Sequence, residues 1–148
     1  MPTIRRILAP TDLSENSLSA IRYAAELAEK FDAELVLLNV VLDQVLVLPD
    51  AVMPTPVAAG DLDELIAAAR TSLANVVRDL NLGRLNPKVE VRVGVPSDEI
   101  VSAAKELKAD LLCVSTHGRT GLAHFFLGSV AEKIVRYSPC AVLTVRPH

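Results

Sequence analysis

Short aliphatic runs alternate with segments of helical periodicity along the whole chain. The aliphatic runs predict strands at 4–9, 35–41, 89–93, 111–114 and 141–145. Apolar residues that recur every three or four positions predict helices at 15–31, 61–80, from 96 to about 107, and at 129–137. This alternation favours parallel strands joined by right-handed crossovers. We therefore predict an α/β fold: a single doubly wound, Rossmann-like domain over residues 1–148, with four helices and a five-stranded parallel sheet in the order 3-2-1-4-5.

Local signals refine these predictions. Ser14 is placed to cap the helix that begins at residue 15, and Gly83 follows the 61–80 helix closely enough to terminate it. The run at 35–41 is typical of a strand covered on both faces. Valines at 89, 91 and 93 alternate with charged residues, which predicts a strand with one wet face at an edge of the sheet.

Composition narrows the class of partner. About half of the residues are hydrophobic, the net charge is −3, and no run of basic residues occurs, so we expect no nucleic-acid partner. No apolar stretch is long enough to span a bilayer, and Arg5 and Arg6 interrupt the apolar start, so we expect a cytoplasmic protein without a signal peptide or membrane contact. Cys113 and Cys140 have no metal-ligand spacing and are expected to be core thiols rather than a disulfide.

One irregular insert, residues 42–60, is unusually apolar and contains three prolines. A surface loop of this composition exposes apolar area unless something covers it. The sequence leaves three interpretations open: the insert folds over a ligand site, packs on a partner subunit, or is disordered.

Two loops with chemical content follow predicted strands. Pro10, Thr11 and Asp12 follow the first strand, and a loop over 115–121 follows the fourth, with Gly128 and Ser129 opening the next helix. Glycines let a backbone approach an anion, and a helix N-terminus adds a partial positive charge, so this arrangement favours phosphate binding. Ligands of open α/β sheets bind beyond the carboxyl ends of the strands, where we expect both loops to face one crevice.

The interpretation of single residues stays open at this point. Asp12 either accepts hydrogen bonds from ribose or an exocyclic amine, binds a divalent ion through water, or is only a turn aspartate near a helix start. The glycines alternatively punctuate a long loop. The chain lacks the motifs of a phosphate-loop lysine, a dinucleotide fingerprint, a zinc site and an esterase nucleophile elbow. No nucleophilic side chain stands near His117 in its motif. A binding loop is therefore predicted rather than a catalytic one.

Five segments, 7–14, 37–40, 117–121, 127–132 and 138–143, resemble the universal stress protein family from end to end. The resemblance implies a five-stranded parallel α/β fold and a homodimer. The nucleotide-binding branch of that family carries the signature Gly-x2-Gly-x9-Gly-Ser/Thr. Gly118, Gly128 and Ser129 match it, whereas Ser115 replaces its first glycine.

By this resemblance, Asp12 and the Val40 backbone contact adenine and ribose, and position 115 lies near the ribose. Gly118, Gly128, Ser129 and Val130 hold the phosphates, and Arg119 adds charge compensation. The complete set of predicted nucleotide-binding residues is Pro10, Thr11, Asp12, Val40, Ser115, Thr116, Gly118, Arg119, Gly128, Ser129 and Val130. If position 115 needs a positive φ, serine costs about 1 kcal/mol there.

Three functions follow from these patterns. The first is an adenine-nucleotide-binding stress regulator that binds ATP (or AMP or ADP), with Mg²⁺ held at most through water on Asp12. The second is a dimeric interaction module that binds no nucleotide, and the third is a slow ATPase, for which no base or arginine finger is evident. The homodimer is predicted to form through the last strand, 141–145, because nothing later in the chain covers its outer edge. Protein partners and the inducing stress are not encoded in any motif.

Overall fold

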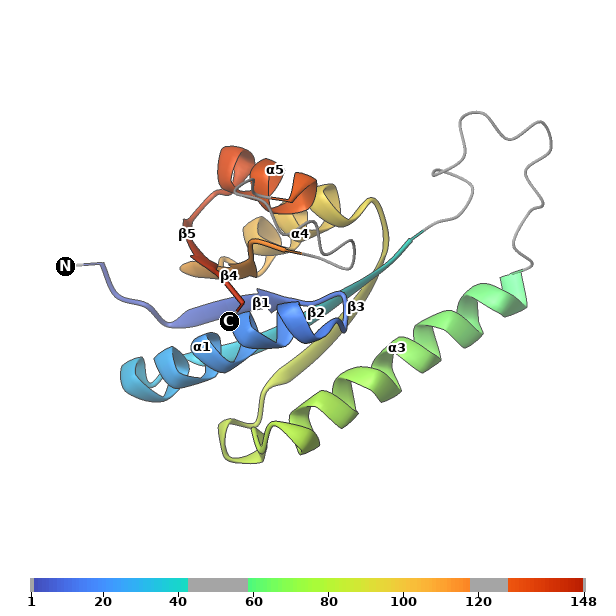
Figure 1. Ribbon diagram of the computed structural model, residues 1–148, viewed down its shortest axis with the longest axis horizontal. Helices are drawn as coiled ribbons and strands as arrows, with labels where there is room; N and C mark the ends of the chain where they lie inside the picture. Colours follow the sequence, from blue (N-terminus) through green and yellow to red (C-terminus); the bar gives the residue numbers. More distant parts are fainter. Residues whose placement is uncertain (1, 43–58, 118–127, 148) are drawn as a thin grey trace.

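The computed structural model describes residues 2–42, 59–117 and 128–147. Five parallel strands form one sheet in the order β3-β2-β1-β4-β5, as predicted. The strands are β1 (Arg6–Pro10), β2 (Glu34–Leu42), β3 (Lys88–Gly94), β4 (Leu111–Ser115) and β5 (Ala141–Val145). The first two run side by side in the same direction, from left to right in Figure 1.

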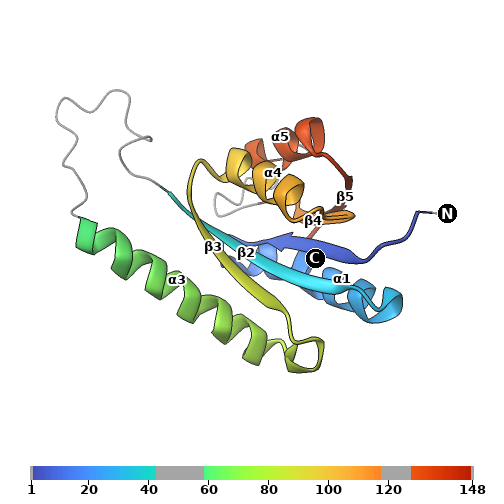
Figure 2. The same ribbon diagram turned by 180° about the vertical axis from the view of Figure 1, so that it is seen from behind.

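Helices cover both faces of the sheet. They are α1 (Glu15–Phe31), α3 (Ala59–Asp79), α4 (Pro96–Glu106) and α5 (Ser129–Tyr137), with a short 3-10 helix, η1 (Gly83–Leu85). One face carries α1 and α3, and the opposite face carries α4 and α5 (Figures 1 and 2). The doubly wound prediction is thereby confirmed.

The core lies in two layers because neighbouring residues of a strand point to opposite faces. Leu35 and Leu37 pack with α1 and α3, whereas Val36 and Leu38 pack with α4 and α5. All four are at most 2% exposed. The prediction that β2 is covered on both faces is therefore confirmed, and this is why its sequence is aliphatic at consecutive positions.

The structure confirms the predicted cap of α1 and corrects one terminator. Ser14 caps α1, accepting a hydrogen bond from Ser17 N–H at 3.3 Å. The prediction that Gly83 terminates the long helix is wrong. Asn81 takes the left-handed conformation (φ 58°), and Leu82 N–H donates to the Val77 carbonyl at 2.8 Å, so Asn81 ends α3. Asparagine tolerates positive φ because its short polar side chain bonds locally.

Several strand and helix boundaries also differ from the prediction by one or two residues. The first strand begins at Arg6 and includes Pro10, which pairs with Leu38. Leu42 of the predicted insert belongs to β2, and its Ala59 and Gly60 belong to α3. The interpretations of the insert itself lie outside the described residues. The third strand is at a sheet edge, as predicted.

Both cysteines are free thiols in the part of the chain that the structure describes. Cys113 is fully buried in β4, and burial raises the pKa of its thiol to about 12. A thiol of that pKa is not a nucleophile at neutral pH. Among the described helices, none is long and apolar enough to cross a membrane.

Candidate functional site

The two loops predicted to carry chemistry leave from adjacent strands. In the sheet order, β1 lies between β2 and β4, and all strands are parallel, so their carboxyl ends share one edge. The winding direction reverses at this position, which is where open α/β sheets bind ligands. The strands from which the two loops leave, β1 and β4, are therefore neighbours, as expected.

The sheet separates at this edge. The pairing of β1 with β4 ends at Leu8–Leu112, although β1 continues to Pro10 and β4 continues to Ser115. Arg6 accepts from Asp110 through its carbonyl, so even-numbered residues of β1 direct their backbone groups toward β4. Pro10 therefore lacks an N–H on the side where the pairing has already stopped, and no ladder bond is lost by having proline there.

The turn from β1 to α1 is fixed by its own side chains. Thr11 is 6% exposed, and its hydroxyl lies 2.6 Å from that of Ser17 and accepts from Leu13 N–H at 2.9 Å. Asp12 accepts from Ser14 N–H at 3.0 Å. Leu13 has φ 67°, a left-handed conformation that costs a leucine about 1 kcal/mol. Asp12 thus takes part in the turn, and its contact with a ligand remains a prediction.

Val40 places backbone groups just beyond the end of the β1–β2 ladder. The last rung is the hydrogen bond from Thr11 N–H to the Leu38 carbonyl, at 2.8 Å. Residues two apart on a strand direct their backbone groups to the same side. The N–H and carbonyl of Val40 therefore point toward the side where β1 has ended.

A polar residue that the sequence analysis did not single out lies in the same place. Asn39 is 8% exposed within β2, and its amide nitrogen donates to the Thr11 carbonyl at 2.8 Å. The signal was an asparagine inside an aliphatic run, since a buried amide requires a partner.

At the end of β4, Ser115 bonds to its own loop. Its hydroxyl donates to the His117 carbonyl at 2.9 Å and lies 3.3 Å from the His117 N–H, which donates to it. Ser115 is not among the described residues with positive φ, so the conformational cost considered for serine at this position does not arise. It pairs with Val145 as an ordinary strand residue.

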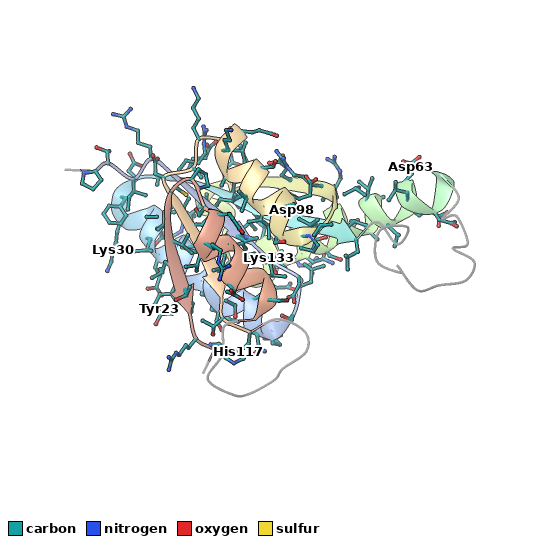
Figure 3. The ribbon with its side chains drawn as sticks, turned by 90° about the horizontal axis from the view of Figure 1, so that it is seen from above. Tyr23, Lys30, Asp63, Asp98, His117 and Lys133 are labelled. Atoms are coloured by element: carbon teal, nitrogen blue, oxygen red, sulfur yellow. The ribbon has the colours of Figure 1, made fainter. Side chains whose placement is uncertain are left out.

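Thr116 joins this loop to two further elements. Its N–H donates to the Val145 carbonyl of β5 at 3.0 Å, and its carbonyl accepts from Gly128 N–H at 2.9 Å. Its hydroxyl lies 2.9 Å from Nδ1 of His117, the residue labelled in Figure 3, which follows the end of β4. The N-terminus of α5 is thereby fixed beside the ends of β4 and β5.

The first turn of α5 presents unused donors. Gly128 is the N-cap residue with no side-chain cap, and the first helical bond runs from Glu132 N–H to the Gly128 carbonyl. The N–H groups of Ser129, Val130 and Ala131 therefore have no carbonyl partner within the helix. Ser129 and Val130 are exposed. The N–H of Gly128, by contrast, is bonded to Thr116, so it is not one of these donors.

Nothing in the described part of the chain requires glycine at 128. Its φ of −57° is open to any residue, and a Cβ there meets only the Thr116 carbonyl oxygen, at 3.4 Å. This is an ordinary van der Waals distance. A glycine that the fold itself does not require is typical of a backbone segment that another molecule must approach closely.

Other predicted features fall outside the described residues or away from this site. Gly118 and Arg119 are not described. Among the described residues, no group of three or more His, Cys, Asp or Glu is arranged to hold a metal ion. A groove of about 470 Å³ lies between α4 and α5, near Asp98 and Lys133 (Figure 3), and none of the predicted nucleotide-binding residues lines it.

Comparisons with known proteins identify a family with this fold. The model of the universal stress protein family matches residues 3–146. A universal stress protein of Methanocaldococcus jannaschii is 35% identical over 143 residues, covering 96% of this chain and 82% of that protein.

Solved structures share the fold. Universal stress protein UspA from Lactobacillus plantarum has a TM-score of 0.76 at 26% identity, covering 97% of this chain and 98% of that one. A universal stress protein solved in complex with cAMP has a TM-score of 0.63 at 26% identity and covers 97% of both chains.

Proposed function

Because this chain belongs to the universal stress protein family, we propose that it is a stress-response regulator that binds an adenine nucleotide, ATP in the first place, at the carboxyl edge of its sheet. The observation that carries the proposal is Gly128, which stands at the uncapped N-terminus of α5 although neither its φ nor its neighbours require glycine there. A relative of the same fold was solved with cAMP, itself an adenine nucleotide.

The arrangement of groups suits a nucleotide from base to phosphates. The Val40 N–H and carbonyl form a donor–acceptor pair that complements the adenine edge. Asp12 and position 115 lie toward the ribose. The N–H groups of Ser129 and Val130, the Ser129 hydroxyl and the α5 dipole stabilise the phosphates, with Gly118 and Arg119 completing that end.

Mg²⁺ fits as a companion of the phosphates rather than as a protein-held metal. The described residues offer no cluster of ligands for it. Phosphate oxygens and waters supply most ligands of Mg²⁺ in nucleotide sites, and one carboxylate such as Asp12 is enough to orient the waters. The same proposal places the protein in the cytoplasm, as one domain over residues 1–148, without a nucleic-acid or membrane partner.

Nucleotide extraction and calorimetry test this function. Protein purified after expression is denatured, and the released nucleotide is identified by its mass. Separately, nucleotide-free protein is titrated with ATP, AMP and GTP in the presence and absence of Mg²⁺. We expect an adenine nucleotide in the extract and preference for ATP over GTP. No released nucleotide together with no heat on titration would contradict the proposal and leave the dimeric interaction module as the function.

The outer edge of β5 is the proposed homodimer contact. Thr116 N–H bonds to the Val145 carbonyl, so odd-numbered residues of β5 face β4, and the backbone groups of Val142 and Thr144 face away from the sheet. Tyr23 on α1 and Tyr137 on α5 are 47% and 64% exposed. Both helices contact β5, one on each face. Antiparallel pairing with a second copy satisfies the free edge by two-fold symmetry.

Light scattering at micromolar concentration tests the dimer. Wild type is expected at twice the monomer mass of 15.9 kDa. Val142→Pro removes one outward-facing donor without touching the β4–β5 ladder, and it is expected to shift the mass toward the monomer. A monomer in the wild-type protein would rule out this contact.

A further inference from the structure

Asn39 bridges two strands at the point where their backbone ladder ends. Its side chain lies on the same face of the sheet as Leu35 and Leu37, because residues two apart share a face, and Thr11 lies on that face beside it. The Thr11 carbonyl can only accept, so the amide group that it meets at 2.8 Å must be the NH₂. The orientation of this amide is therefore fixed by chemistry.

The side-chain bond replaces a backbone bond that a longer ladder would make. In a parallel pair, the residue whose N–H donates to Leu38 accepts in turn from the N–H of Val40. Thr11 donates to Leu38 at 2.8 Å, but among the hydrogen bonds of the described residues its carbonyl accepts from Asn39 and not from Val40. The Asn39 amide thus holds the Thr11 carbonyl in a position where the Val40 N–H makes no hydrogen bond to it.

We propose that Asn39 is a positioning residue that keeps the Val40 backbone N–H available to the nucleotide base and thereby sets the preference for adenine. This inference rests on the function proposed above. Adenine accepts at N1 and donates from its amine, which matches an N–H beside a carbonyl, whereas guanine offers the reverse pattern on that edge. A site that loses its donor discriminates less between the two bases.

Asn39 also helps to position the Asp12 loop, because it bonds Thr11, the residue before Asp12. Thr11 is held by Asn39 through its carbonyl and by Ser17 through its hydroxyl, at 2.8 and 2.6 Å. Removing the amide leaves the Thr11 carbonyl without that donor, and in a parallel ladder the Val40 N–H is the group that takes its place. The ladder is then expected to lengthen by one rung and bury the donor.

Amide exchange tests the inference without any nucleotide. In nucleotide-free wild type, the Val40 amide is expected to exchange rapidly for a residue of a central strand. In Asn39→Leu it is expected to exchange at least about tenfold more slowly, because it has gained a backbone acceptor. A Val40 amide that is already protected in the wild type would overturn the inference, whatever the protein binds.

Nucleotide discrimination supplies the second measurement. Asn39→Leu is expected to lower the ratio of the Kd for GTP to that for ATP by about tenfold. Asn39→His, whose Nδ1–H is as many bonds from the backbone as the asparagine amide, is expected to restore it. Val36→Ala is the matched control: it removes buried volume from the same strand, so it lowers the melting temperature without changing the ratio.

Separate outcomes identify which proposal fails. If wild type binds neither nucleotide, the proposed function fails, and the exchange measurement still decides the local role of Asn39. If wild type prefers ATP and Asn39→Leu keeps the same ratio, the inference on Asn39 is wrong while the function stands. If Asn39→Leu does not fold, Asn39→Ala provides the same test, because it removes both donors with a smaller apolar side chain.

Discussion

The two ends of the central sheet are built differently. At the amino end, polar groups of the chain bond one another. Glu34 of β2 forms ion pairs with Arg6 of β1 and Lys88 of β3, which ties three strands together. Asp110 accepts from the backbone N–H groups of Arg5 and Arg6, both at 2.9 Å. The polar groups at this end are therefore bonded within the chain.

At the carboxyl end, backbone groups point out of the fold. The ladder between β1 and β2 stops before Val40, the pairing of β1 with β4 stops before Pro10, and α5 starts without a side-chain cap. Polar groups left without internal partners are a cost to stability unless water or a ligand bonds them. The difference indicates that polar groups bonded within the chain lie at one end of the sheet, and that backbone groups available to a ligand lie at the other.

The largest effect on ATP binding is expected from a substitution at Gly128, whereas the same substitution at Gly83, at the other end of the sheet, should have none. Gly128→Val is expected to abolish ATP binding in calorimetry, because the side chain occupies the place where phosphate meets the backbone. Gly83→Val is the matched control. No atom lies within 4 Å of a Cβ built there, and Gly83 precedes the amino end of β3, so binding and folding should be preserved. Wild-type affinity in Gly128→Val would rule out this placement of the phosphates.

Ser129→Ala removes a single hydroxyl from the carboxyl end. One charge-assisted hydrogen bond to phosphate is worth about 1–2 kcal/mol, so the Kd for ATP should rise about 5- to 30-fold. The effect should be smaller for adenosine than for ATP when both are titrated, since adenosine has no phosphate. An equal loss for the two ligands would place Ser129 elsewhere in the site.

Glu34→Gln is the corresponding change at the amino end, and it should affect stability alone. Hydrogen bonds from Lys88 and then Arg6 lower the pKa of Glu34 from its ordinary value of 4.5. A lowered folded-state pKa stabilises the protein above the unfolded pKa, and this contribution is lost as pH falls through the folded value.

Chemical denaturation at several pH values checks this. With the side chain 27% exposed, Glu34→Gln should cost about 1 kcal/mol or less at neutral pH. The difference from wild type should shrink below the ordinary pKa of 4.5. The Kd for ATP should be unchanged, and a parallel loss of affinity would contradict the separation of the two ends.

The smallest effect is expected for Ser115→Gly. The Ser115 hydroxyl is bonded to the His117 backbone, and its φ is not positive, so glycine relieves no strain. Affinity for ATP should therefore be equal to that of the wild type. A large loss in calorimetry would show that the hydroxyl itself contacts the nucleotide.

Sequence signals were reliable where one residue decides the outcome locally. Ser14 was identified as the cap of α1 because its hydroxyl needs only an N–H three residues away. The terminator of the long helix was misassigned because Gly83 and Asn81 both satisfy the local pattern. The choice between them depends on where Leu82 is buried, which is a property of the core.

Periodicity alone determined the order of elements, the two-faced burial of β2 and the edge position of β3, because side-chain spacing dictates which faces can be covered. The resemblance in five motifs marked the candidate site. Tertiary structure decided which backbone groups of that site remain available. Gly128 N–H is taken by Thr116, twelve positions earlier in the sequence, and the Thr11 carbonyl is taken by Asn39, across the sheet. Such pairings depend on where strands stop relative to one another, and no local pattern encodes that register.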